Sequence, residues 1–174
     1  MYYNLSYKEA VKRLESKDLN SITEGIKALR GSGKPEAVKL VVDVLRNNGD
    51  NGVQNECIKF INDIKDQQAV KYLMECIEDK KNSKILNFLV SCAWQNNLDY
   101  TQHLNIFVHI LLTKEYLTAY EAFSVIENNV DKLDISDAEN IIQIIEKGLT
   151  DIDNEKRPMV KDMIETIKDI KGIA

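Results

Sequence analysis

The sequence contains few of the residues that interrupt regular secondary structure. Among its 174 residues there are 2 prolines and 7 glycines, too few for an all-β fold with many tight turns. No apolar run approaches the ~18 residues that a membrane-spanning helix needs, and the first residues, Met1 to Tyr7, lack the basic-then-apolar pattern of a signal peptide. We therefore expect neither membrane contact nor secretion.

The sequence is also poor in cysteine and histidine. The three cysteines, Cys57, Cys76 and Cys92, are widely spaced, with no CxxC pair and no histidine at metal-ligand spacing. Such usage is typical of a reducing compartment, so we expect the protein in the cytoplasm. It also predicts neither a metal site nor a disulfide framework.

Acidic residues outnumber basic ones, with 28 Asp and Glu against 23 Lys and Arg and a formal net charge of −5. Between Glu115 and Glu155, eleven acidic residues stand against Lys132 and Lys147 alone. An acidic half could receive a basic partner, although solubility explains it equally well. Binding to a phosphate backbone needs clustered Lys and Arg, so no nucleic-acid partner is expected.

An internal repeat gives the clearest indication of the fold. The segments AVKLVVDVLRN and AVKYLMECIED begin at Ala37 and Ala69, 32 residues apart. Apolar or small residues in each recur at i, i+3, i+4, i+7 and i+8, which is the pattern of an amphipathic helix. A second helical series, EGIKAL, ECIKFI and EAFSVI, begins at Glu24, Glu56 and Glu121, and a small residue leads its apolar stripe, which would let neighbouring helices approach closely. We expect an all-α fold of ten helices in five antiparallel pairs, forming one domain over residues 1–174.

Three polar residues stand where helices are expected to begin. Asp66, Thr101 and Ser136 are predicted N-caps, and Glu139 follows Ser136 at the spacing of a capping box. All three cysteines fall on apolar positions of the repeat, so we interpret them as packing residues.

From Asp50 to Ile77 the chain reads DNGVQNECIKFINDIKDQQAVKYLMECI. This segment resembles the HEAT-repeat pattern of the kind also seen in phycobilin lyases. The resemblance implies a HEAT-like α-solenoid (an α-α superhelix), and it transfers no catalytic residue. The matching positions are the helix opening at Asp50 and Val53, the stripe residues Cys57 and Ile61, the turn at Asp66, and Ala69, Val70 and Leu73 of the next helix.

Other patterns carry little chemistry. His103 and His109 are six residues apart and so lie on different helix faces, where they cannot chelate one ion together. Gly31-Ser-Gly-Lys34 lacks the spacing of a phosphate-binding loop and is interpreted as a helix-ending turn. No catalytic residue and no cofactor are predicted. The aromatic residues Tyr2, Tyr3 and Tyr7 are expected to cover the first repeat.

The sequence therefore predicts a non-enzymatic module that binds another protein through the faces of the second helices of the pairs. The alternatives are a HEAT-like enzyme or nucleic-acid-binding protein, of the DNA glycosylase or lyase type, or a helper subunit that folds beside a larger protein. Trp94 is either a contact anchor or a residue that seals the gap between repeats. The expected partner-binding residues are Glu24, Lys27, Glu56, Lys59, Asn87, Ser91, Trp94, Glu121 and Ser124.

Overall fold

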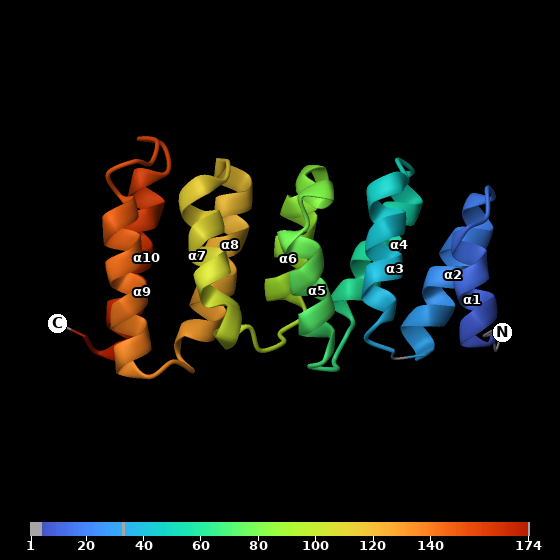
Figure 1. The fold of residues 1–174 in the computed structure, drawn as a ribbon, viewed down its shortest axis with the longest axis horizontal. Coiled ribbons are helices and arrows are strands. Elements are labelled where there is room, and N and C mark those ends of the chain that lie inside the picture. Colours follow the sequence, from blue (N-terminus) through green and yellow to red (C-terminus); the bar gives the residue numbers. More distant parts are fainter. Residues whose placement is uncertain (1–4, 33, 174) are drawn as a thin grey trace. The chain divides into compact units, whose positions relative to one another are not determined.

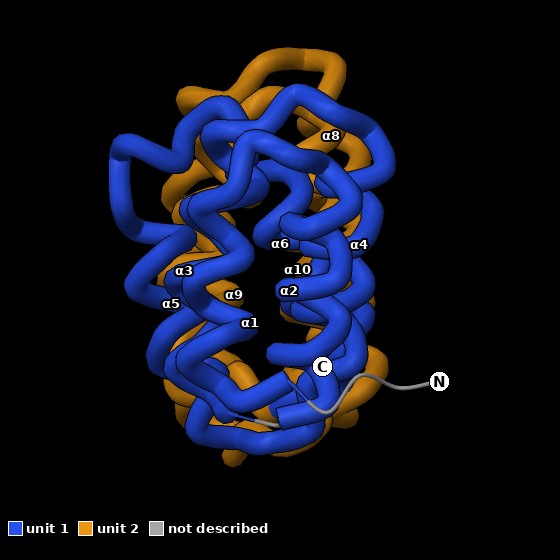
Figure 2. Tube along the Cα trace, turned by 90° about the vertical axis from the view of Figure 1, so that its right-hand side faces the viewer, with its two compact units in different colours: residues 1–98 blue, residues 99–174 orange. Residues whose placement is uncertain are grey.

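The computed structural model describes residues 5–32 and 34–173, and within them every regular element is helical (Figure 1). The predicted all-α class is confirmed. The chain divides into two compact units, residues 1–98 (unit 1) and residues 99–174 (unit 2) (Figure 2). None of the described helices is long and apolar enough to cross a membrane. Tyr2 and Tyr3 lie outside the described residues.

Unit 1 arranges its helices in two layers (Figure 2). Helices α1, α3 and α5 lie side by side in the first layer, and α2, α4 and α6 in the second. Each first-layer helix packs on the second-layer helix that follows it in the chain. The elements are α1 (Tyr7–Leu14), α2 (Leu19–Ser32), α3 (Ala37–Asn47), α4 (Asn51–Asn62), α5 (Ala69–Glu78), the 3₁₀ helix η1 (Lys80–Ile85) and α6 (Leu86–Gln95).

Unit 2 has the same kind of packing. Its first layer contains α7 and α9, its second layer contains α8 and α10, and consecutive helices pack as α7 with α8 and α9 with α10. The elements are the 3₁₀ helix η2 (Thr101–His103), α7 (Leu104–Thr113), α8 (Tyr116–Val130), α9 (Ile135–Gly148) and α10 (Arg157–Lys171).

The apolar stripes of the repeat form the cores of the two units. Their side chains leave water on folding, which supplies the main favourable term for such helices. The packing role of the cysteines is confirmed, because all three are buried. Buried stripe residues that the periodicity predicts include Ala37, Val41, Leu45, Cys57, Phe60, Ile61, Leu73, Cys76, Leu89, Cys92, Ala122, Val125, Ile126, Ile141, Ile145, Val160, Met163 and Ile167.

One small stripe residue shows why size matters at a helix contact. Gly25 of α2 is buried against α1, and a Cβ at this position would lie 2.9 Å from the backbone oxygen of Ala10. Any larger residue would therefore push α1 and α2 apart. This confirms the expected close approach for the first helix contact.

The helix starts were predicted less well. Ser136 does not cap α9; the carboxylate of Asp134 accepts the N–H of Asp137 at 2.7 Å, so the helix begins at Ile135 and Ser136 is already inside it. Thr101 is likewise the first residue of η2, and its own N–H donates to Asp99. Asp66 accepts the N–H of Gln68 in the turn before α5. In each case an Asp two or three residues ahead of the amide satisfies it.

Candidate interaction surfaces

The residues expected to contact a partner lie on second-layer helices. In unit 1 they follow one another across a single layer, because α2 packs beside α4 and α4 beside α6. Glu24 and Lys27 are on α2, Glu56 and Lys59 on α4, Asn87, Ser91 and Trp94 on α6, and Glu121 and Ser124 on α8 of unit 2.

Polar side chains connect neighbouring helices within this layer of unit 1. The Arg30 guanidinium at the end of α2 lies 3.4 Å from the Asp63 carboxylate and 4.0 Å from that of Glu56, both belonging to the next repeat. One repeat further, the Asn62 amide donates to the Gln95 side chain at 2.6 Å. Part of the polar pattern thus holds the repeats together.

The expected contact residues divide into buried and open groups. Only 14% of the Glu56 side chain is exposed, and its buried Oε2 has no hydrogen-bond donor among the residues that the structure describes. Lys59 lies 3.0 Å from the Glu56 Oε1, yet its side chain remains 60% exposed. Lys27 is exposed and forms no ion pair within the part of the chain that the structure describes. Lys27 and Lys59 therefore present the open charges of this layer.

The remaining expected residues have local contacts. Glu24 pairs with Arg13 of α1, and the Ser91 hydroxyl accepts a hydrogen bond from Gln95 at 2.8 Å. The Ser124 hydroxyl donates to the backbone oxygen of Tyr120 at 3.4 Å. Asn87, Trp94 and Glu121 are half-buried. The structure thus brings Glu56 and Lys59 together and distributes the other residues along their helices.

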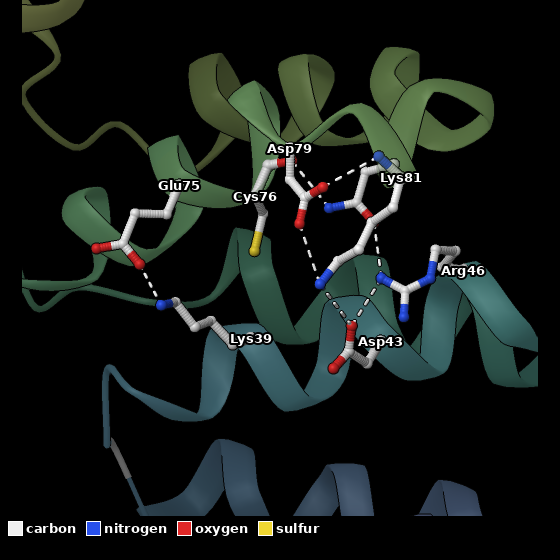
Figure 3. Close-up of polar contacts among 8 residues, drawn as sticks. Lys39, Asp43, Arg46, Glu75, Cys76, Asp79 and Lys81 are labelled. Atoms are coloured by element: carbon white, nitrogen blue, oxygen red, sulfur yellow. Dashed lines mark hydrogen bonds and ion pairs between the residues drawn. The ribbon is translucent and has the colours of Figure 1, made fainter.

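A polar cluster that the sequence did not reveal links α3 to the segment after α5 (Figure 3). The Asp43 carboxylate lies 2.7 Å from Arg46 and 3.9 Å from Lys81, which itself lies 3.0 Å from Asp79. The Arg46 guanidinium donates to the buried Asn82 side chain at 3.0 Å, across 36 residues of sequence. The sequence signal that could have revealed this cluster is a pair of polar residues separated by one repeat plus one helical turn, as Arg46 and Asn82 are.

Hydrogen bonds between charged groups shift the pKa values of side chains on α3, on α5 and in the segment after α5. Lys39 and Glu75 form an ion pair, and their hydrogen bond raises the pKa of Lys39 and lowers the pKa of Glu75. Hydrogen bonds from the Lys81 backbone and side chain lower the pKa of Asp79. Each shift favours the charged form, so these groups are charged at neutral pH.

The pKa shifts of the Cys57 and Cys76 thiols favour the neutral form instead. Burial, with the Asp43 charge adding to it, raises the pKa of Cys76 to about 11, and burial beside Glu56 raises the pKa of Cys57 to about 12. A thiol needs a lowered pKa and exposure to act as a nucleophile. These two cysteines are therefore unreactive at neutral pH.

The two histidines lie in different elements. His103 is half-buried in η2, and His109 is exposed on α7. Among residues 5–32 and 34–173, no group of three or more His, Cys, Asp or Glu side chains is arranged to hold a metal ion.

A pocket of about 230 Å³ lies between the ends of α2 and α4 and contains Arg30, Lys34 and Lys65. Three cations at one pocket could receive an anion, but each already has a neighbour. Arg30 pairs with Asp63, the Lys34 ammonium lies 4.4 Å from the centre of the Tyr7 ring, and Lys65 donates to the backbone oxygen of Asn96 at 3.3 Å. These contacts give the pocket a role in packing.

In unit 2, Lys156 and Lys171 contact backbone oxygens at helix ends. Lys156 is only 5% exposed, and its ammonium donates to the carbonyls of Leu112 at 2.9 Å and Lys114 at 2.6 Å, at the end of α7. Lys171 donates to the carbonyls of Asp131 and Leu133, just after α8. A cation at a helix C-terminus is favoured because the unpaired carbonyls there carry partial negative charge.

The two units consequently differ in charge. Unit 1 contains 15 basic and 13 acidic residues, a net charge of +2, whereas unit 2 contains 8 basic and 15 acidic residues, a net charge of −7. The second unit also exposes large apolar side chains on α8: Tyr116 is 41%, Leu117 69% and Tyr120 54% exposed. Sequence reasoning named Glu121 and Ser124 of this helix and missed the aromatic residues beside them.

No family model matches the chain, and no curated protein matches it in sequence. Among solved structures, an engineered protein from a structural genomics consortium is 20% identical with a TM-score of 0.44, covering 94% of this chain and 80% of that one. A match at this level assigns neither a family nor a function.

Proposed function

We propose that the chain is a non-enzymatic protein-binding module, built as a HEAT-like α-solenoid of five helix pairs. The partner contacts the outward faces of the second-layer helices. The observation that carries this proposal is the row of polar side chains across α2, α4 and α6, in which Lys27 and Lys59 keep their charged ends in solvent. A row of many weak contacts suits an extended or helical partner segment.

The solenoid part of the proposal has support within each unit. First-layer helices lie beside first-layer helices and second-layer helices beside second-layer helices, which is how repeats of one helix pair stack. The segment that resembles HEAT repeats, Asp50 to Ile77, supplies α4 and most of α5. The three buried thiols fit a reducing compartment such as the cytoplasm.

The test is an affinity pull-down with the full chain and a Lys27→Glu/Lys59→Glu variant. The matched control is Lys80→Glu/Lys84→Glu, which makes the same charge change on exposed lysines of η1. We expect one protein to be captured in stoichiometric amount by the natural chain and the control, and to be lost from the Lys27/Lys59 variant. Equal capture by all three chains would contradict the proposed face.

Capture of no protein at all would favour the enzyme or nucleic-acid alternatives. Chromatography on heparin separates these outcomes, because binding to a phosphate backbone is strong at low salt and falls steeply by about 0.2 M. We expect the chain to pass through heparin unretained at low salt.

A further inference from the structure

The exposed apolar side chains of unit 2 gather on one face of α8. Tyr116, Leu117 and Tyr120 lie within two turns of the helix, opposite the face that buries Ala119 and Ala122. Helices α7 and α10, which pack on α8, leave Tyr116 41%, Leu117 69% and Tyr120 54% exposed. We call Tyr116, Leu117 and Tyr120 the α8 patch. Aromatic residues are enriched at the centres of protein interfaces.

The charge around the α8 patch restricts what can cover it. Unit 2 has a net charge of −7, and exposed carboxylates precede and follow the patch, at Glu115 just before α8 and at Glu127 within it. The cations Lys114 and Lys156 act on Glu115 and help to lower its pKa, so the negative charge near the patch comes from the surplus of carboxylates in unit 2 as a whole. A second copy of this chain would bring the same negative charge, so self-association through this face is opposed by repulsion.

We propose that the α8 patch binds a basic amphipathic helix of a partner protein. Apolar side chains of that helix pack on Tyr116, Leu117 and Tyr120, while its Lys and Arg face the carboxylates of unit 2. This inference rests on the proposed protein-binding function but uses a different surface from Lys27 and Lys59, and it adds the chemical class of the partner.

The probe is a fluorescent helical peptide of about 18 residues, with Leu on one face and Lys on the other. Its binding to the full chain is measured by anisotropy at low salt. We expect at least tenfold weaker binding to a Leu117→Ser/Tyr120→Ser variant. The matched control, Leu19→Ser, removes an exposed leucine at the start of α2 and should bind as the natural chain does. All three substituted side chains are exposed, and circular dichroism verifies the folds.

Three results would overturn the proposal. The patch variant could bind as tightly as the natural chain, a scrambled peptide of the same composition could bind as well as the amphipathic one, or a peptide with Glu in place of Lys could bind equally. A dimer in sedimentation that the patch variant abolishes would assign the face to a second copy instead. The Lys27→Glu/Lys59→Glu variant should retain the peptide, so this inference and the proposed function can fail separately.

Discussion

Unit 1 and unit 2 both stack helices in two layers, yet they use their basic residues differently. In unit 1, side-chain cations contact carboxylates of neighbouring repeats, as Arg30 does with Asp63 and Lys39 with Glu75. In unit 2, Lys156 and Lys171 donate to backbone oxygens at the ends of α7 and α8. Arg30 and Lys39 thus join repeats in unit 1, whereas Lys156 and Lys171 close helix ends in unit 2.

The two units also differ in the net charge that they offer to a partner. Unit 1 is close to neutral, with 15 basic and 13 acidic residues, and Lys27 is among its exposed charges. In unit 2, acidic residues outnumber basic ones by 15 to 8, so the net charge there is −7. A surplus of negative charge attracts a positively charged partner over a long range.

Each unit also buries an asparagine that bonds to backbone. Asn82 in unit 1 donates to the Cys76 carbonyl at 2.9 Å and accepts from Arg46. Asn129 in unit 2 donates to the Val125 carbonyl at 2.8 Å and accepts the N–H of Tyr100 at 3.0 Å. The Asn129 oxygen also accepts from the Lys132 ammonium at 3.2 Å, so in both units a cation reaches the buried amide.

The largest effect is expected in the rate at which the cysteine thiols are alkylated. This rate reports on unit 1 alone, because all three cysteines are there. At pH 8 a thiol with a pKa of about 11, as for Cys76, has roughly a thousandth of its population as thiolate. We expect iodoacetamide to label the native chain more than 100-fold more slowly than the chain in denaturant. Mass spectrometry of the products measures this, and rapid labelling of native Cys76 would contradict its burial.

The same pKa shifts give a direction for stability against pH. The native pKa of Cys57 and Cys76 is higher than that of an unfolded thiol, about 8.5. The unfolded chain therefore loses protons first as pH rises, so this contribution is complete below about pH 8.5 and declines above it. Urea unfolding between pH 7 and 10 should show falling stability, and a Cys57→Ala/Cys76→Ala variant should show a smaller decline.

The next effect is expected at the buried lysine of unit 2. Lys156→Met keeps the chain length of the side chain but removes the donor to the Leu112 and Lys114 carbonyls. We expect a loss of about 2 kcal/mol in the free energy of unfolding, because hydrogen bonds from a charged donor are lost at a buried site. Lys161→Met, on the exposed face of α10, should change stability by less than about 0.5 kcal/mol.

A smaller loss is expected when the repeats of unit 1 lose a cross-helix cation. Arg30→Met removes the contacts with Asp63 and the mostly buried Glu56. The expected loss in the free energy of unfolding, measured in urea, is about 1 kcal/mol. The loss is small because partly exposed ion pairs contribute little, but it is measurable because Glu56 has few other partners. Lys27→Met on the same helix should be close to neutral. Equal effects of the two substitutions would mean that Arg30 does not join the repeats.

The periodicity of the sequence predicted the helices and part of each buried stripe. In α3, Ala37 and Val41 are buried as predicted, but Leu40 of the predicted stripe is half-buried while Val38 and Val42 are buried. Apolar spacing does not report where a helix begins, because a single hydrogen bond to an Asp decides that. The true cap of α9 is therefore Asp134, two residues before the expected Ser136.

The apolar periodicity could not predict polar contacts between segments that are far apart in the sequence. Lys156 looks like any surface lysine in the sequence, and only the packing of α10 in unit 2 brings it to the end of α7, 42 to 44 residues earlier. The α8 patch was missed for a similar reason. Tyr116 and Tyr120 could have served a core, and their exposure follows from which faces α7 and α10 cover.

The smallest expected effect is the change with salt in the free energy of opening of each unit, and it tests the contrast between the units most directly. Hydrogen exchange of buried amides, followed by mass spectrometry at about 0.05 M and 0.5 M NaCl, measures the free energy of opening of each unit separately. Salt screens attraction and repulsion alike. We expect the opening free energy of α3 and α4 to fall by a few tenths of a kcal/mol, as the ion pairs of unit 1 weaken, and that of α7 and α9 to rise, as repulsion among carboxylates is relieved. A fall of similar size in both units would contradict the claim that unit 2 leaves its carboxylates uncompensated.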